Sequence, residues 1–205
     1  SSRRHGTVKD GNTLTDTSPE EVSHGYSISL GCAHAEWKSA KINLLDTPGY
    51  ADFAGDALAG LVAADGALVA VSGTAGVEVG TERMFREAVK RKDPVLFVVT
   101  MMDKEMADCD RAYDAIKQRL TTKVVPVEIP IGSGSEFRGI INLLTKKAHL
   151  FKVGTKSGEF TEAPIPKEEQ SRFKRYHAEM VEAIAATDDV IVVGSGAGGL
   201  SAALS

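Results

Sequence analysis

Residues 43–50, Asn-Leu-Leu-Asp-Thr-Pro-Gly-Tyr, form the stretch on which the interpretation of this chain rests. An apolar run leads into the carboxylate of Asp46, and a Thr-Pro-Gly turn follows at once. A strand that delivers a carboxylate into such a turn suits a site for magnesium and a terminal phosphate. Asp46 can hold the water shell of the metal, and the N–H of Gly49 can approach a phosphate because no side chain intervenes. The alternative is an ordinary turn in which Asp46 caps the strand.

Hydrophobic periodicity on either side of this stretch predicts strands and helices in alternation. This order predicts a doubly wound α/β sheet, in which ligands bind beyond the carboxyl ends of the strands. Asp46 follows one such end and Thr100–Asp103 follows another, which favours the phosphate site over the ordinary turn. The expected strands are 26–32, 41–45, 66–72, 95–100 and 124–129, and the expected helices are 53–62, 81–92 and 107–120, with a helical turn at 19–21.

The pattern changes after residue 129. A Gly- and Ser-rich segment, two short β-like runs and a polar connector precede a long helix that begins near Lys167. We therefore expect three parts in the chain. Residues 1–129 form the sheet domain, residues 130–189 form a small appended α+β subdomain, and residues 190–205 form a separate tail.

Composition excludes several classes of protein. The 205 residues are 42% hydrophobic and 25% charged, which is ordinary for a globular protein. A formal net charge of −4 provides no overall basic surface for nucleic acid, so no direct DNA contact is expected. Two cysteines make no disulfide framework and fit a reducing compartment. No apolar run is long enough to cross a membrane, and no signal peptide is recognisable, so we expect a cytoplasmic protein.

Several motifs, in this order, resemble the GTP-binding domain of elongation factor G, the ribosomal translocase, and of its elongation-factor-G-like paralogue. Residues 46–49 match the DTPG motif of switch II, and residues 25–28 (Gly-Tyr-Ser-Ile) match the GITI-type motif of switch I. Residues 124–140 resemble the entry into the subdomain inserted in that domain, and residues 166–189 resemble its helix. The similarity implies an incomplete P-loop-GTPase-like sheet, with residues 1–129 as a partial GTP-binding domain.

The resemblance implies roles for individual residues. Asp46 would bind Mg²⁺ through water, and Gly49 would offer its N–H to the γ-phosphate of GTP. Ser27 stands where the family has the switch I Thr that coordinates Mg²⁺. Thr100 and Asp103 stand where the family has the NKxD guanine-reading motif, and Asp103 would accept the ring N–H and amino protons of guanine. As an alternative, Asp103 simply begins the following helix.

The chain departs from the family pattern at three places. Tyr50 replaces the His that orients the attacking water, and a phenol does not act as a base at neutral pH, although it can hydrogen-bond a water. Met101 replaces the Lys whose stem packs along guanine. No GxxxxGK[ST] phosphate loop occurs in the sequence, and the family has it before switch I. We therefore expect this chain by itself to bind GTP poorly and to hydrolyse hardly any.

The last 16 residues resemble a different family, the FAD-binding start of flavoprotein oxidoreductases. An apolar run enters Gly194, Gly196 and Gly199 at GxGxxG spacing, which is the dinucleotide fingerprint. The ribose-binding acid expected about 20 residues further on is not in the sequence. FAD is therefore not expected here, and a loosely packed glycine-rich tail is the favoured interpretation.

Three functions follow from these observations. The first is a fragment of an elongation-factor-G-like GTPase, with GTP or GDP, Mg²⁺ and the ribosome as the implied ligands and partner. The second is a fragment of an FAD-dependent oxidoreductase, identified by the glycine-rich tail. The third is a non-catalytic module that binds the ribosome or another protein. We favour the first.

Overall fold

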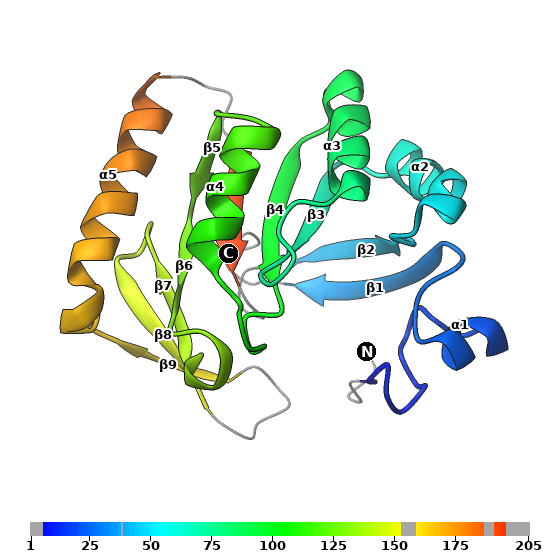
Figure 1. The fold of residues 1–205 in the computed structure, drawn as a ribbon, viewed down its shortest axis with the longest axis horizontal. Coiled ribbons are helices and arrows are strands. Elements are labelled where there is room, and N and C mark those ends of the chain that lie inside the picture. The colour runs from blue at the N-terminus through cyan, green and yellow to red at the C-terminus, as the bar shows by residue number, and fades with distance from the viewer. Residues whose placement is uncertain (1–5, 38, 153–158, 187–190, 196–205) are drawn as a thin grey trace. The chain divides into compact units, whose positions relative to one another are not determined.

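The computed structural model describes residues 6–37, 39–152, 159–186 and 191–195 of a mixed α/β protein with a parallel sheet (Figure 1). The chain divides into two compact units. Unit 1 comprises Ser1–Ala67 and Arg86–Asp93, and unit 2 comprises Leu68–Phe85 and Pro94–Ser205. No described helix is both long and apolar enough to pass through a membrane.

Unit 1 is built on an antiparallel hairpin that places Asp46 at a strand end. The two strands pair along their whole length, with Gly31 opposite Asp46. Within the described residues the hairpin forms its own two-stranded sheet. The expected strand over 26–32 is wrong, because the chain becomes extended and paired only from Gly31. The elements of unit 1 are α1 (Pro19–His24), β1 (Gly31–Trp37), β2 (Ala40–Asp46), the 3-10 turn η1 (Ala51–Phe53) and α2 (Ala54–Ala63).

Unit 2 contains a four-stranded sheet in the order β3-β4-β10-β5. Strand β10 runs parallel to both of its neighbours. The side chains of Phe97 and Val99 on β4 are completely buried, which explains the continuous apolar run in the sequence. The elements are β3 (Ala67–Ser72), α3 (Val79–Arg91, which crosses into unit 1), β4 (Val95–Thr100), α4 (Cys109–Arg119), β5 (Val124–Pro126) and β10 (Ile191–Ser195).

Strand β10 corrects the expectation of a loosely packed tail. Ile191–Ser195 lies between β4 and β5, with Val193 opposite Phe97 and Gly194 opposite Val98. The exposed fraction of Val193 is 1%. A β-branched run contributes well to the interior of a parallel sheet, so the same residues that suggest a dinucleotide fold complete this sheet instead. Gly196 and Gly199 lie outside the described residues.

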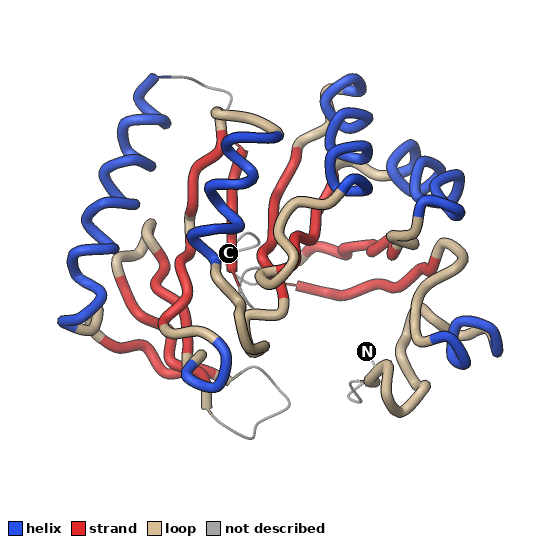
Figure 2. The backbone as a smooth tube through the Cα atoms, viewed as in Figure 1, coloured by secondary structure: helices blue, strands red, loops and turns tan. Residues whose placement is uncertain are grey.

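The segment after β5 forms a second, antiparallel sheet in the order β6-β7-β8-β9, followed by the long helix α5 (Figure 2). Its core is continuous with that of the parallel sheet, because Ile129, Ile141 and Met180 belong to the same buried cluster as Val124 and Ile116. The elements are β6 (Glu128–Ile131), η2 (Gly134–Glu136), β7 (Gly139–Asn142), β8 (Lys147–Phe151), β9 (Phe160–Ala163), η3 (Lys167–Glu169) and α5 (Gln170–Ala186).

Candidate functional site

Asp46 ends β2 and is held by a residue that the sequence analysis did not single out. The hydroxyl of Thr15 donates to Asp46 Oδ2 at 2.5 Å. A Cβ on Gly31, which pairs with Asp46, would lie 2.7 Å from the Cβ of Thr15. Gly31 is therefore required for Thr15 to reach across the first residue of β1. The result is a carboxylate and a hydroxyl side by side at the strand end, a pair of oxygen donors of the kind that suits hydrated Mg²⁺.

The turn after Asp46 is anchored at its middle and open at its end. Pro48 is buried, whereas Gly49 is exposed. A Cβ on Gly49 would meet no atom within 4 Å. A Cβ on Gly60 of α2 would lie 2.7 Å from the methyl of Thr47, so the turn packs closely on that helix. The backbone of Gly49 is thus accessible to a ligand.

Tyr50 is in contact with the switch I segment. Its ring centroid lies 4.6 Å from that of Tyr26, and Tyr26 stacks in turn on His24 at 5.4 Å. The exposed fraction of Tyr50 is 58%. This row of three rings brings the two sequence motifs, residues 25–28 and 46–50, together within unit 1.

A buried carboxylate shapes the switch I segment around Ser27. Glu21, the third residue of α1, forms a capping box with Ser18 and is only 4% exposed. Its Oε1 accepts the backbone N–H groups of Ile28 and Ser29, both at 3.0 Å. These bonds and a third from the N–H of Ser18 lower the pKa of Glu21 to about 2. Because the carboxylate takes these N–H groups, residues 28 and 29 form a loop rather than the expected strand.

Residues 100–103, which the sequence predicts as the guanine-reading position, lie at and after the end of β4 in unit 2. The N–H of Gly73 donates to the carbonyl of Thr100 at 2.9 Å, and Met102 is buried. Asp103 is exposed and pairs with Lys104 at 3.5 Å. Pairs this exposed contribute little, so the Asp103 carboxylate is accessible to a base. The idea that Asp103 begins the next helix is wrong, because α4 begins at Cys109 with Asp108 as its N-cap.

Gly194 lies at the same edge of the sheet but within strand β10, not in a turn after it. It is buried and opposite Val98. Since β10 and β4 are parallel, their carboxyl ends lie at one edge, where Thr100 also ends its strand. Of the site residues predicted from sequence, unit 1 therefore holds Ser27, Asp46, Gly49 and Tyr50, and unit 2 holds Thr100, Asp103 and Gly194.

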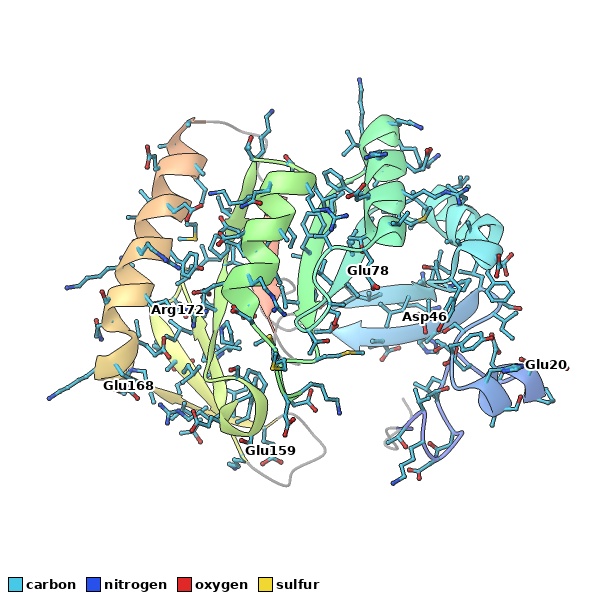
Figure 3. The ribbon with its side chains drawn as sticks, viewed as in Figure 1. Glu20, Asp46, Glu78, Glu159, Glu168 and Arg172 are labelled. Carbon is cyan, nitrogen blue, oxygen red and sulfur yellow. The ribbon has the colours of Figure 1, made fainter. Side chains whose placement is uncertain are left out.

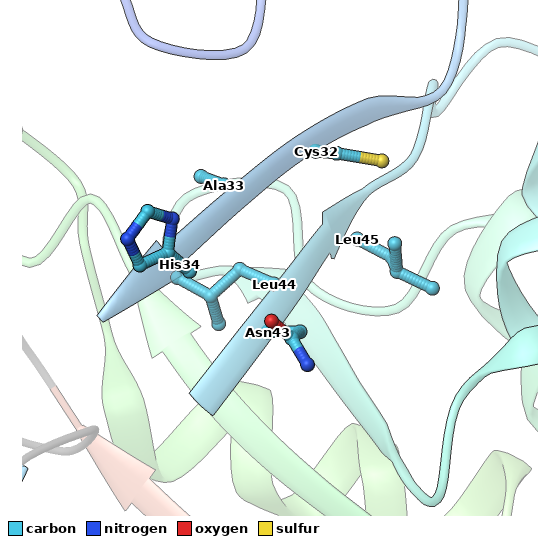
Figure 4. A pocket seen from close by; sticks show the side chains of 6 residues that line it. All are labelled: Cys32, Ala33, His34, Asn43, Leu44 and Leu45. Carbon is cyan, nitrogen blue, oxygen red and sulfur yellow. The ribbon is translucent and has the colours of Figure 1, made fainter. Parts of the chain in front are cut away.

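A shallow hollow on the β1–β2 hairpin has a different character (Figure 4). Leu44, 39% exposed, lies at its centre. Its walls present no carboxylate, lysine or arginine, so it does not fit a phosphate. The lining residues are Cys32, Ala33, His34, Asn43, Leu44 and Leu45.

The fold and the DTPG turn are those of the GTP-binding domain of translational GTPases. The family model of the elongation factor Tu GTP binding domain matches residues 1–159, and the chain belongs to this family. It is 35% identical to elongation factor G of Mycoplasma genitalium over 187 residues, which cover 91% of this chain and 27% of that protein. It is also 35% identical to elongation factor G of Thermotoga maritima over 192 residues, 93% of this chain and 28% of that one.

A crystal structure of a protein from Thermus thermophilus has the same fold, with a TM-score of 0.86 and 31% sequence identity. The match covers 95% of this chain and 33% of that one. The chain thus corresponds to an elongation-factor-G-like G-domain fragment, and it spans about a quarter of the length of the curated relatives that it matches.

Proposed function

We propose that this chain carries the two switch segments and the guanine-reading loop of a translocation-type GTPase that acts on the ribosome in the cytoplasm. Asp46 supports this proposal most strongly. It ends a strand, opens a turn with an accessible glycine backbone, and already pairs with a hydroxyl. The family's GTP-binding domain supplies the ligand class, namely GTP or GDP with Mg²⁺.

On the phosphate side, Asp46 would hold Mg²⁺ through water, and the Thr15 hydroxyl hydrogen-bonds to this carboxylate. Ser27 offers its hydroxyl from a loop that Glu21 holds in place. Gly49 donates its N–H to the terminal phosphate oxygens. When bound there, Mg²⁺ would supply positive charge next to the phosphates.

Tyr50 stands at the water-positioning place of the family. Its hydroxyl orients a water by hydrogen bonding but does not remove a proton from it at neutral pH. The ring of Tyr50 contacts that of Tyr26, with the centroids 4.6 Å apart, so the water-positioning place lies beside the switch I motif. Little hydrolysis is therefore expected from this chain, in keeping with the sequence, which contains no GxxxxGK[ST].

On the base side, the Asp103 carboxylate accepts the ring N–H and the amino group of guanine. Thr100 is the last residue of β4 and precedes the Asp103 loop. Met101 stands at the sequence position of the family's Lys, and its side chain is exposed. An adenine presents a ring acceptor where guanine has a donor, so the carboxylate selects against adenine.

The test measures which nucleotide the chain prefers and asks whether a substitution at Asp103 changes that preference. Amide chemical shifts are followed by NMR during titration with millimolar GTP, ATP or XTP in excess Mg²⁺. We expect weak binding with GTP preferred and shifts at residues 46–50 and 100–104. Asp103→Asn replaces an acceptor with a donor, which matches the 2-oxo group of xanthine, so the preference should move to XTP by about tenfold. An Asp103→Asn chain that still prefers GTP would refute this role.

Hydrolysis provides the second part of the test. Phosphate release by the isolated chain should not exceed the rate in buffer alone. Micromolar affinity for a fluorescent GTP analogue would contradict the expected weakness. Ribosome pull-down with no base preference in the titration would favour the non-catalytic binding module instead.

A further inference from the structure

The loop between β4 and α4, residues 101–108, carries Asp103, and two other residues of this loop have an unusual backbone conformation. Met101 and Met106 both have positive φ angles, 58° and 65°, although neither is glycine. Their side chains are 54% and 82% exposed, so side-chain burial does not stabilise these conformations. Such conformations persist only where the surrounding structure imposes them. The contacts that hold this loop therefore decide where the Asp103 carboxylate lies.

Two of these contacts come from the strand–loop–helix framework of the parallel sheet. Gly73, after β3, donates its N–H to Thr100 and accepts the N–H of Asp108, both at 2.9 Å. Arg111 of α4 donates from Nη2 to the carbonyls of Thr74 at 2.7 Å and of Met106 at 3.3 Å. These bonds fix both ends of the loop.

A third contact holds the middle of the loop and comes from the antiparallel sheet. The N–H of Gly134, in the turn after β6, donates to the carbonyl of Met102 at 2.8 Å. A Cβ on Gly134 would lie 3.4 Å from the carbonyl oxygen of Lys104, so the turn lies directly against the loop backbone. Gly132 and Gly134 have φ angles of 76° and 58°, which other residues adopt only with strain. Asp103 thus lies between two residues that this turn touches.

Arg172 of α5 anchors the start of that turn (Figure 3). Its Nη1 donates to the carbonyl of Pro130 at 2.7 Å, two residues before Gly132. The same guanidinium binds both carboxylate oxygens of Asp110 in the first turn of α4 and lies 3.6 Å from Glu169. The side chain of Arg172 is 23% exposed. Arg172, Asp110 and Glu169 line one polar hollow together with Met102. A planar guanidinium that serves a carboxylate and a carbonyl at once has one orientation only.

We propose that Arg172 is a positioning residue for base reading, because it links α5 and α4 to the 132–134 turn that holds the Asp103 loop. Asp110 fixes the guanidinium at the start of α4, and the guanidinium fixes Pro130. The turn that follows Pro130 then fixes Met102 beside Asp103. The link to base reading rests on the proposed function, whereas the mechanical link does not.

The test compares two arginines of one helix in the full chain. Arg172→Met removes the bonds to Pro130 and Asp110. Arg175→Met is the matched control, since Arg175 also pairs with Asp110, at 3.3 Å, but is 61% exposed, and its removal leaves the Pro130 bond in place. Amide hydrogen exchange is measured at Gly134 and Lys104, with Gly76 and Leu120, both in backbone bonds outside the turn, as references.

We expect Arg172→Met to accelerate exchange at Gly134 and Lys104 about tenfold with the reference amides unchanged, and Arg175→Met to change neither by more than about twofold. Arg172→Lys keeps the positive charge but cannot donate to Asp110 and Pro130 with the planar geometry of a guanidinium. The acceleration of exchange in this variant should therefore lie between those of the two Met variants. Equal acceleration at Gly134 and Leu120, or none at Gly134, would overturn the proposal.

A nucleotide measurement then tests the link to base reading. Arg172→Met should lower the ratio of GTP to ATP affinity of the chain at least threefold, while Arg175→Met leaves it unchanged. An unchanged ratio in Arg172→Met refutes the role in base reading. A wild-type chain without any base preference would instead refute the proposed function. The hydrogen-exchange result would still decide whether Arg172 holds the 132–134 turn against the Asp103 loop.

Discussion

Glu128→Gln should remove the loss of stability that unit 2 shows as the pH rises. Glu128 lies in β6, opposite Asn142 of β7, and its exposed fraction is 1%. Burial raises the pKa of this carboxyl to about 8, against the opposing effect of a hydrogen bond with Asn142. The Asn142 Oδ1 atom already accepts the N–H groups of Leu144 and Thr145, which leaves its NH₂ group to donate to Glu128. We therefore expect this carboxyl to be protonated in the folded state at neutral pH.

The size of the effect follows from the pKa difference. The unfolded chain releases this proton near pH 4.5, whereas the folded chain retains it up to about pH 8. The stability that this group contributes is thus complete below pH 4.5. It falls by about 1.4 kcal/mol per pH unit as the pH rises from 4.5 to about 8, and the loss is complete above pH 8. Over the ~3.5 pH units between the two values the loss approaches about 5 kcal/mol, an upper bound because water can enter when the group ionises. Gln keeps the shape and stays neutral throughout.

The assay is urea unfolding at pH values from about 5 to 8.5, followed by near-UV circular dichroism of tyrosine, since Tyr113 and Tyr176 are buried in unit 2. The wild type should lose stability across this range, and Glu128→Gln should not. Glu136→Gln, at an exposed acid of the same unit, is the control and should follow the wild type. The pKa values of Asp110 and Glu179 are lowered, so the titration of these carboxyls changes stability only below the pH range of the assay. A wild-type curve that is flat or rises, or a parallel Glu128→Gln curve, would refute the reasoning.

Three further changes test the local structure. Thr15→Val removes the hydroxyl bonded to Asp46 and should destabilise unit 1 by about 0.5–1.5 kcal/mol, seen as faster limited proteolysis before β1; an unchanged rate would count against the bond. Glu21→Gln should speed exchange of the two loop amides that it binds by about tenfold, and wild-type protection of these amides should persist above pH 4.5 and disappear as the pH falls towards 2. Gly139→Ala places a Cβ 2.2 Å from the His149 carbonyl and should cost about 2–4 kcal/mol in urea unfolding; a cost below about 1 kcal/mol would show that the β7–β8 ladder yields easily.

The sequence was informative wherever the signal is local. The helical turn at 19–21, the apolar strands at 66–72 and 95–100 and the helix near Lys167 follow from propensity and periodicity over a few residues, and the structure has each within a few residues of its expected place. The DTPG turn was recognisable because proline and glycine limit the backbone conformations there.

Other features depend on residues far apart in the chain. The alternation over 26–32 looks like a strand, but the Glu21 carboxylate takes two of its N–H groups, and no period of the sequence records that competition. In the same way the run at 191–195 looks like the start of a second protein. It becomes a central strand because β4 and β5 both offer it parallel pairing and a buried face.

The amino-acid sequence by itself determined the class of fold and the family, because these depend on short motifs in a set order, and it predicted which residues take the phosphate and guanine positions. Only the tertiary structure decided how those residues are held: Thr15 on Asp46, Tyr26 on Tyr50, and Arg172 through the 132–134 turn on the loop of Asp103. Each of these contacts joins side chains or backbone atoms that lie far apart in the sequence. Their geometry is set by packing, and packing is a property of the folded chain that no local pattern contains.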